Sequence, residues 1–540
     1  MMKQLCLVIL FILFCHTIRA QSWQDTLQII DKTFSRYQPG HPGCQLSISR
    51  NGEIIFSKAW GMADLEQNVS LTTHSVIEAG SVSKQFTAAA ILLLEQQGKL
   101  SLDDDVRKYV PEIPDYGYPI KLRYMLHHTS GIRDWGAVAS LTGWPRTKKF
   151  YTNDDALDII IHQQHLNNIP NAEYIYSNSN YNLFAIIVQR VSGLSLAAFT
   201  HKYIFGPAGM TLTQWRDDPN RIVPNRAIAY DKRDTSYQTD MPDEYVYGNG
   251  GLLTCAEDLL KWNNFYQQRK LGGPTLLSTQ IKTEPFNNGV MHNYAAGLVI
   301  GKIMGWDNIS HSGATAGYRA YLETFPELGL SMAVLSNTSE FNIVEPAAMI
   351  RRVFVTGKPG KNVPKENSFE PDAPALNHFA GLYRNDRDKS TFTLSVKDNH
   401  LFLGNQTSLT ATSEHTFSAG NFIFVINGID GLYIPLSPRD TIPFTKVNPV
   451  HLSQKDFDRY TGTYFSTETS SPILIRENNG KLVIQLKPGT EYEMAATYKD
   501  AFKADAADAD IIFTMDKGST INSMHIYVPR ARDVTFKKTQ

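Results

Sequence analysis

Cysteine is scarce in this sequence, with 4 in 540 residues. Two of these fall in the first twenty residues, which leaves Cys44 and Cys255 for the folded part of the chain. Two cysteines do not make a disulfide framework, and neither has neighbours at the spacing of a zinc site. We therefore expect two separate buried thiols, with a Cys44–Cys255 disulfide as the alternative.

An excess of charge of either sign is also missing. Lys and Arg together number 52 against 53 for Asp and Glu, a net charge of −1, and no basic stripe interrupts this balance. Nucleic acid and anionic membranes are therefore not expected as partners. The glycine-rich stretch at 247–254 lacks the Lys-Ser/Thr of a phosphate loop, and the acidic stretch at 505–510 lacks the glycine and distal glutamate of a calcium loop. No metal and no cofactor is predicted.

Long apolar runs are missing beyond the N-terminus. The run from Leu5 to Cys15 is too short to span a bilayer, and with one early lysine before it and Ala20 behind it has the order of a secretory signal peptide. We expect residues 1–20 to be a signal peptide cleaved near Ala20. The mature protein would then be secreted or periplasmic with no stable membrane anchor, and a retained anchor is the alternative.

Residues 21–355 mix strand-like and helical stretches. Two hairpins are predicted, one around Asn51-Gly52 near the start and one around residues 326–329 near the end. Helical stretches lie between them at 84–97, 154–165 and 181–192. This order predicts an α+β domain, in which one antiparallel sheet is built from both ends of the domain, flanked by helices, with a helical region inserted.

The remainder of the chain has a different composition. Residues 356–375 are rich in Pro, Gly, Lys and Asn, which predicts a linker. Residues 376–540 consist of short alternating runs separated by polar turns, which predicts an all-β accessory region.

The accessory region contains a repeat of the FxGxY type. The stretch "HFAGLYRND" recurs as "RYTGTYFST", so that Gly381 and Tyr383 correspond to Gly462 and Tyr464. One barrel made of two halves and two separate barrels are both compatible with this repeat.

Ser81 and Lys84 lie three positions apart where a long apolar helical stretch begins. Serine is a common helix cap, and a Ser-x-x-Lys pair alone is a weak signal. The same spacing places both side chains on one helix face, where a lysine amine can reach the serine hydroxyl and activate it as a nucleophile. Ser81 can therefore be interpreted either as a helix cap or as one half of a catalytic pair with Lys84.

Further motifs follow in a fixed order. Tyr176 and Asn178 stand in "YSNSN", which we expect to be a polar loop before a helix, and His311 and Gly313 stand in "HSGATAGY", which we expect to precede a strand. With the Ser81–Lys84 pair, this order resembles the serine β-lactamase and penicillin-binding-protein family. The similarity spans roughly residues 25–350 and is to the branch of class C β-lactamases, DD-peptidases, D-aminopeptidases and esterases. Residues 376–540 resemble the lipocalin-like barrels attached to some D-aminopeptidases.

The resemblance implies an acyl-transfer site. Ser81 would attack a carbonyl and become acylated, and Lys84 would help to remove its proton. Tyr176 would act as general base and then as acid, provided that the nearby Lys84 cation lowers the pKa of the phenol. Asn178 would bind Lys84 and the substrate amide, and the N–H groups of Ser81 and Ala314 would form the oxyanion hole.

The remaining implied roles concern substrate binding. Gly313 would let the substrate lie close to the strand. His311 stands where class C β-lactamases carry a lysine, and a histidine that is mostly neutral at pH 7 is a weaker anchor for a carboxylate, so we expect poor turnover of β-lactams. His127 and His128 are interpreted as structural.

We therefore expect a secreted serine hydrolase acting on an amide or ester, such as a small peptide with D-amino acid character, of the kind derived from cell walls. A class C β-lactamase and a non-catalytic binding protein of the same fold are the alternatives. The accessory region would either support the enzyme or narrow its cleft. The sequence does not predict an oligomeric state.

Overall fold

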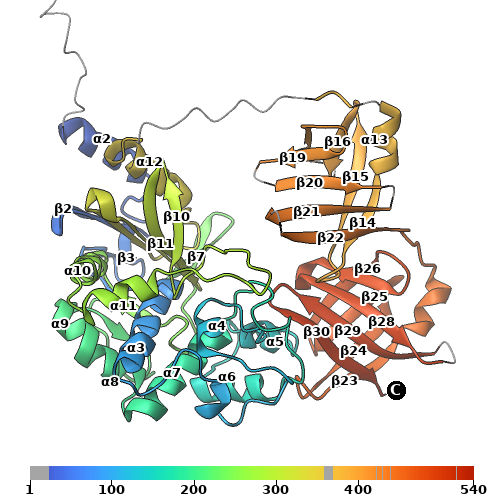
Figure 1. Cartoon of the computed structure of the whole chain (residues 1–540), viewed down its shortest axis with the longest axis horizontal. Helices are drawn as coiled ribbons and strands as arrows, with labels where there is room; N and C mark the ends of the chain where they lie inside the picture. The colour runs from blue at the N-terminus through green and yellow to red at the C-terminus, as the bar shows by residue number, and fades with distance from the viewer. Residues whose placement is uncertain are drawn as a thin grey trace, which may run out of the picture.

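The computed structural model describes residues 23–357, 369–371, 373–404, 406–420, 422–428, 430–437, 439–517 and 520–539. The predicted signal peptide and most of the predicted linker lie outside these residues. The described chain forms an N-terminal domain (residues 23–357) and two β units that are stacked beside it (Figure 1). Helix α13 (Ala373–Phe379) begins within the last three residues of the predicted linker, and its residues Leu376 and Phe379 belong to the core of the first β unit.

A six-stranded antiparallel sheet forms the centre of the N-terminal domain, in the order β10-β11-β12-β13-β1-β2. Its strands are β1 (Cys44–Arg50), β2 (Glu53–Trp60), β10 (Val299–Ile303), β11 (Trp306–Thr315), β12 (Tyr318–Phe325) and β13 (Leu330–Ser336). The pairing of β1 with β13 joins the two ends of the domain, as the sequence predicts. Asn51 and Gly52 connect β1 to β2 with φ of 52° and 88°, the left-handed conformation that a two-residue hairpin turn requires.

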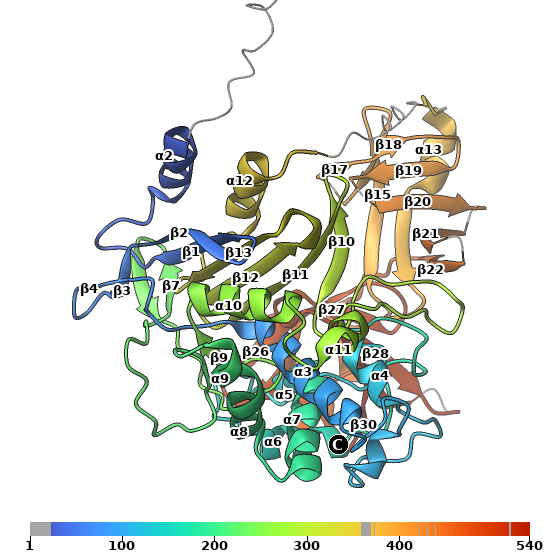
Figure 2. The ribbon, with the colours of Figure 1, turned by 60° about the vertical axis from the view of Figure 1, so that its left-hand side comes forward.

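Successive side chains of each strand point to opposite faces of this sheet, and each face is covered by helices. In β13, Met332 and Val334 pack with helices α2 (Trp23–Phe34) and α12 (Val344–Phe354), while Leu335 joins the core on the opposite face. Helix α10 (Ala256–Gln267) covers that opposite face, so the sheet is enclosed between helices (Figure 2). This arrangement explains why β1 and β13 are buried almost throughout.

The inserted region is mainly helical. It comprises η1 (Gly80–Ser83), α3 (Lys84–Gln96), α4 (Leu122–Leu126), α5 (Trp135–Ser140), α6 (Asn153–Ile161), α7 (Asn178–Ser192), α8 (Leu196–Thr200), α9 (Gly206–Ala208) and α11 (Gly273–Gln280). Helix α3 is buried from Lys84 to Leu94 and packs against α7, α8 and α11. Among the described residues, no single helix is long and apolar enough to cross a membrane, although the bent pair of α7 with the segment Leu196–Ala208 meets that test jointly.

The accessory region contains two β units. The first is a nine-stranded sheet between β14 (Gly381–Asn385) and β22 (Asp440–Val447) in sequence, and the second is a closed eight-stranded barrel from β23 (Gly462–Ser466) to β30 (Ala531–Lys538). The FxGxY repeat therefore marks the start of two units, and the all-β prediction is confirmed. The other strands of the first unit are β15 (Thr391–Lys397), β16 (His400–Leu403), β17 (Thr407–Ser408), β18 (Thr410–Ala411), β19 (Thr416–Ala419), β20 (Phe422–Asn427) and β21 (Gly431–Ser437). Those of the barrel are β24 (Ser471–Asn478), β25 (Lys481–Lys487), β26 (Thr490–Ala496), β27 (Ala501–Ala504), β28 (Ala509–Met515) and β29 (Ile521–Val528).

The repeated tyrosine has the same structural role in both units. The Tyr383 hydroxyl donates to the carbonyl of Phe379 at 3.0 Å, and the Tyr464 hydroxyl donates to the carbonyl of Tyr460 at 2.8 Å. Both tyrosines are buried, so each one fastens the segment before the first strand to the core of its unit.

The two cysteines are separate. Cys44 begins β1 and Cys255 precedes α10, and both thiols are free and buried. The prediction of two buried thiols is confirmed, and the disulfide alternative is wrong.

Candidate active site

Ser81 lies in the η1 turn and does not cap the following helix. The residue before α3 is Ser83, whose side chain donates to the carbonyl of Gly80 at 2.5 Å instead of accepting from the helix. Gly80 has φ of 50°, and a Cβ at this position would lie 2.7 Å from the backbone N of Ala314. The turn that carries Ser81 is thus pressed against β11 at the position of the expected oxyanion hole.

Gly313 also allows the η1 turn to lie close to β11. A Cβ at Gly313 would lie 2.0 Å from the carbonyl oxygen of Ala79 and 2.9 Å from the backbone N of Ser81. The missing side chain therefore makes room for the nucleophile turn. Gly313 also lines the cleft, where its expected role beside the substrate stays a prediction.

Lys84 is fully buried beneath Ser81. Its Nζ lies 3.1 Å from Ser81 Oγ, 2.9 Å from Asn178 Oδ1 and 2.6 Å from the carbonyl oxygen of Asn249. Burial, followed by the neighbouring Arg146 cation, lowers the Lys84 pKa well below its usual range. A neutral amine fits these contacts, because its two N–H groups can donate to the two carbonyl oxygens while its lone pair accepts the Ser81 proton.

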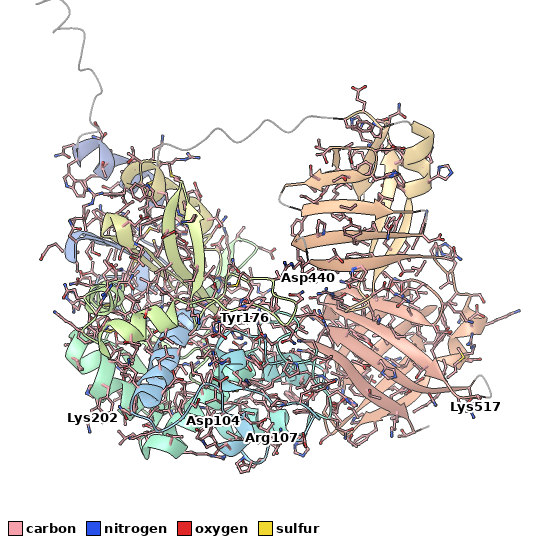
Figure 3. The ribbon with its side chains drawn as sticks, viewed as in Figure 1. Asp104, Arg107, Tyr176, Lys202, Asp440 and Lys517 are labelled. Carbon is pink, nitrogen blue, oxygen red and sulfur yellow. The ribbon has the colours of Figure 1, made fainter. Side chains whose placement is uncertain are left out.

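Tyr176 lies directly before α7, at the boundary between the N-terminal domain and the β units (Figure 3). Its ring centroid is 4.2 Å from that of His128, 4.8 Å from Lys84 Nζ and 4.9 Å from the guanidinium carbon of Arg530. Burial raises the Tyr176 pKa above its usual value, and a hydrogen bond with Ser81 only partly opposes this. The expected lowering of the Tyr176 pKa by Lys84 is therefore wrong, and the group is a phenol near neutral pH.

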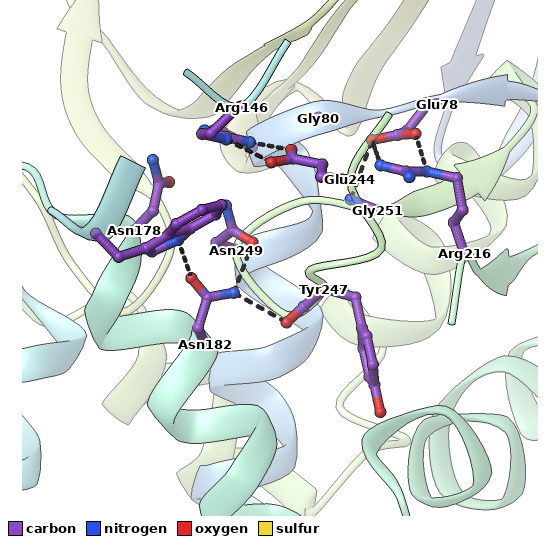
Figure 4. Close-up of polar contacts among 12 residues, drawn as sticks. Glu78, Gly80, Arg146, Asn178, Asn182, Arg216, Glu244, Tyr247, Asn249 and Gly251 are labelled. Atoms are coloured by element: carbon purple, nitrogen blue, oxygen red, sulfur yellow. Dashed lines mark hydrogen bonds and ion pairs between the residues drawn. The ribbon is translucent and has the colours of Figure 1, made fainter. Parts of the chain in front are cut away.

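Asn178 is the first residue of α7, so it stands on the helix and not in a loop before it. Its backbone N–H donates to Asp134 Oδ2 at 2.7 Å, which fixes the start of the helix. One turn further on, Asn182 Nδ2 donates to Asn249 Oδ1 at 2.8 Å and to the Tyr247 carbonyl at 3.1 Å (Figure 4). These bonds hold Asn249, whose carbonyl accepts from Lys84.

His311 lies within β11 and not before it. Its Nδ1 donates to the Ser312 carbonyl at 2.6 Å, so its Nε2 accepts from the Tyr294 hydroxyl at 2.9 Å. Burial and the nearby Lys84 lower the His311 pKa to about 4. His311 is therefore neutral at pH 7, in agreement with its expected weakness as an anchor for a carboxylate.

The edge of β11 at this point is open to the cleft. Strand β10 pairs only with Trp306–Ser310 of β11, and among the described residues no strand continues that side along residues 311–315. The η1 turn packs against β11 there. An extended peptide can therefore lie along this edge next to Ser81.

The cleft has a volume of about 440 Å³ and brings together nearly every residue expected in the site. Six of the seven expected residues line it, namely Ser81, Tyr176, Asn178, His311, Gly313 and Ala314. Lys84 is the exception because it lies underneath. His127 is structural as expected, with Nδ1 3.0 Å from the Tyr294 carbonyl, whereas His128 also stacks on Tyr176.

The residues that line the cleft but were not predicted from the sequence include Arg146, Asn249, Arg319 and Arg530. Asn249 and Arg146 come from loops that have no spacing rule, so no local signal marks them. Arg530 comes from the turn between β29 and β30 of the barrel, more than two hundred residues beyond the last of the catalytic motifs, which contains His311 and Gly313. Only the fold can place it beside Tyr176.

The barrel is fastened to the N-terminal domain next to the catalytic residues. Arg133 and Glu468 form a fully buried ion pair, with Arg133 NH1 2.5 Å from Glu468 Oε1. Arg133 NH2 also donates to the Asp533 carbonyl at 2.8 Å, and the Asp134 N–H donates to the Arg530 carbonyl at 3.0 Å. The side chain of Asp134 also accepts from the Asn178 N–H, so Asp134 connects the interface with the barrel directly to the candidate active site.

We expect the protein to lose stability in acid because His311 is buried as the neutral form. An unfolded histidine binds a proton near pH 6.5, whereas folded His311 does so only near pH 4. The unfolded state therefore binds more protons between these values, and this one residue is expected to remove about 2 kcal/mol from the free energy of unfolding between pH 7 and pH 4.5.

Urea denaturation of wild type and His311→Gln at both pH values measures this effect. The other titrating groups contribute equally to both proteins, so the acid-induced loss should be smaller in the variant by about 2 kcal/mol. An identical loss in both proteins would show that His311 is not held neutral.

Comparison with known proteins assigns the N-terminal domain. Residues 28–353 match the family model described as Beta-lactamase. Penicillin-binding protein 4* of Bacillus subtilis (strain 168) is 28% identical over 334 residues, which cover 56% of this chain and 69% of that protein. The D-aminopeptidase of Gluconobacter oxydans (strain 621H) is 27% identical over 301 residues, covering 55% of this chain and 56% of that protein, so the match spans about half the length of this relative.

Solved structures agree on the fold. An octameric penicillin-binding protein homologue from Pyrococcus abyssi superposes with a TM-score of 0.53 at 20% identity, covering 95% of this chain and 99% of that chain. A D-stereospecific amidohydrolase from Streptomyces sp. gives a TM-score of 0.52 at 19% identity, covering 61% of this chain and 98% of that chain. The chain therefore belongs to the β-lactamase family of serine hydrolases.

Proposed function

We propose that this protein is a secreted hydrolase that cleaves an amide or ester of a small peptide with D-amino acid character through an acyl-enzyme on Ser81. The observation that carries the proposal is the contact of Lys84 Nζ with Ser81 Oγ at 3.1 Å, supported by two carbonyl acceptors. The names of the relatives, a D-aminopeptidase and a D-stereospecific amidohydrolase, support the substrate class.

In the proposed acylation, Ser81 Oγ bonds to the substrate carbonyl carbon and passes its proton to the neutral amine of Lys84. The resulting oxyanion accepts from the N–H groups of Ser81 and Ala314, a contribution of about 3 to 4 kcal/mol per donor. The Tyr176 hydroxyl gives its proton to the leaving nitrogen or oxygen as that bond breaks. The Lys84 proton then restores the Tyr176 phenol.

Deacylation reverses these proton transfers. A water molecule bonds to the acyl carbon and gives a proton to the same amine, and the bond to Ser81 Oγ breaks as that oxygen regains a proton. The lowered Lys84 pKa supports a neutral amine that acts as the base, and the raised Tyr176 pKa supports a phenol that acts as the acid. A neutral His311 provides no permanent cation at the position where class C β-lactamases carry a lysine.

Labelling with a fluorophosphonate probe tests the proposal. Wild type should gain the mass of one probe, and Ser81→Ala should gain none, because Ser81 has the amine of Lys84 within reach as a base. Ser312→Ala is the matched control, since Ser312 lines the same cleft without a lysine beside it, and it should be labelled like wild type. Equal labelling of Ser81→Ala would refute the nucleophile, and an unlabelled wild type would favour a non-catalytic binding protein.

A further inference from the structure

The cleft around Ser81 is lined by cations without lining carboxylates. Arg146, Arg319 and Arg530 contribute to its surface, and its lining contains neither aspartate nor glutamate. Arg146 is neutralised by Glu244, which binds its guanidinium through both carboxylate oxygens (Figure 4). Neither Arg319 nor Arg530 forms an ion pair with any residue that the structure describes.

The two unpaired arginines differ in how their guanidinium groups are held. Arg319 NH1 donates to the Ala316 carbonyl at 2.6 Å and to the Tyr318 carbonyl at 2.8 Å, so it is partly satisfied by the chain. The Arg530 side chain is exposed to the cleft, and its guanidinium lies 4.9 Å from the centroid of Tyr176. Arg530 is therefore the cation that is available to a ligand beside Ser81.

The backbone at Arg530 is fixed although the side chain is open. Its carbonyl oxygen accepts from the Asp134 N–H and from Asn167 Nδ2, each at 3.0 Å. Asn167 Oδ1 in turn accepts from the Arg532 N–H at 2.8 Å, and Arg532 pairs with Glu173 at 3.1 Å. The hairpin is thus anchored at Arg530 and at Arg532, which holds the backbone of Arg530 beside the cleft.

The position of Arg530 indicates on which side of the scissile bond its charge would lie. Tyr176 is the proposed acid for the leaving group, so a cation over its ring lies beside the leaving group and not beside the acyl group. An arginine fork matches the geometry of a carboxylate, and a free ammonium at the same place would be repelled.

We propose that the leaving group of the substrate carries a carboxylate and that Arg530 of the barrel binds it. Arg530 is then a specificity-determining residue contributed by the accessory region, and a peptide with a free C-terminal carboxylate fits the site better than an amino acid amide. This inference rests on the proposed function of Ser81. It gives the barrel a role in substrate selection beyond support or narrowing of the cleft.

The test uses two small esters that differ in the leaving group alone. The leaving phenol of 3-acetoxybenzoate carries a carboxylate, and that of 3-acetoxybenzamide carries a neutral amide. In Arg530→Gln, the acid-to-amide ratio of kcat/KM is expected to fall about 10- to 100-fold relative to wild type, since a charge-assisted hydrogen-bonded contact is lost. Comparing ratios between proteins cancels the intrinsic reactivity of the two esters.

Two further variants separate binding from general effects on the fold. Arg530→Lys keeps the charge without the fork and should retain part of the preference. Arg476→Gln removes a charge from the same barrel at a residue that does not line the cleft, and it should keep the wild-type ratio. Equal losses on both esters in Arg530→Gln would mean that Arg530 acts through Tyr176 or the fold, and this would overturn the proposal.

Fluorophosphonate labelling distinguishes a failure of the carboxylate site from a failure of the proposed hydrolase. A wild type that is labelled at Ser81 but shows no change of ratio in Arg530→Gln refutes the carboxylate site while leaving the hydrolase intact. A wild type that is not labelled refutes the proposed function itself.

Discussion

Replacing Lys84 with methionine is expected to lower the rate of acylation of Ser81 by about 10³-fold, because the variant has no base within reach of the hydroxyl. Methionine approximates the length of the lysine stem, so no large cavity is created. The Asn178 and Asn249 oxygens lose their donor, which destabilises, whereas the removal of a buried amine stabilises. Rapid-mixing measurement of acylation and thermal denaturation report the two effects separately.

The pH profile provides the control for this variant. Only the neutral form of Lys84 can accept the Ser81 proton, so kcat/KM of wild type should rise with pH through the Lys84 pKa, which burial places below the usual lysine range. The residual kcat/KM of Lys84→Met should not show this rise with pH. Acylation near the wild-type rate would show that Lys84 is not the base.

Replacing Glu468 with alanine is expected to destabilise the protein by about 3 to 5 kcal/mol, because it leaves the Arg133 charge buried without its partner. Glu468 also accepts from the Gln164 N–H at 2.8 Å and the Thr535 N–H at 3.2 Å, which would lose their acceptor. Urea denaturation measures the change. Catalysis should weaken as well, since the neighbouring Asp134 holds both the barrel hairpin and the start of α7.

A surface pair in the same barrel gives the matched control. Arg476 and Glu491 form an ion pair at 2.5 Å whose side chains are 39% and 26% exposed. Glu491→Ala should cost no more than about 1 kcal/mol, because exposed ion pairs contribute little. If Glu468→Ala cost no more than this control, the buried pair would not be what fastens the barrel.

The features predicted correctly from the sequence are those that are encoded locally. The Asn51-Gly52 turn fixes the β1–β2 hairpin by its own backbone preference, and the spacing of Ser81 and Lys84 brings them together on one turn of helix. The repeat predicted at Tyr383 and Tyr464 marks the starts of the two β units, and the bond of each tyrosine to a carbonyl four residues earlier, which was not predicted, is equally local. In these cases the partner lies within a few residues, so the pattern contains the contact.

The errors concern quantities that depend on distant neighbours. The direction of the Tyr176 pKa shift depends on burial, which no spacing reveals. Arg530 has no motif at all. Such residues can be found only once the fold shows which segments meet.

The position of Arg530 in the chain has a consequence for biosynthesis. Domains fold as units while the chain is made at about 5 to 20 residues per second, so the N-terminal domain, ending near residue 357, is complete roughly 10 to 35 s before residue 530 is added. During this interval the chain already contains Ser81 and Lys84, whereas Glu468, the partner of Arg133, and Arg530 are still to be added. Synthesis thus delivers the nucleophile and its base before the arginine that we propose selects the substrate.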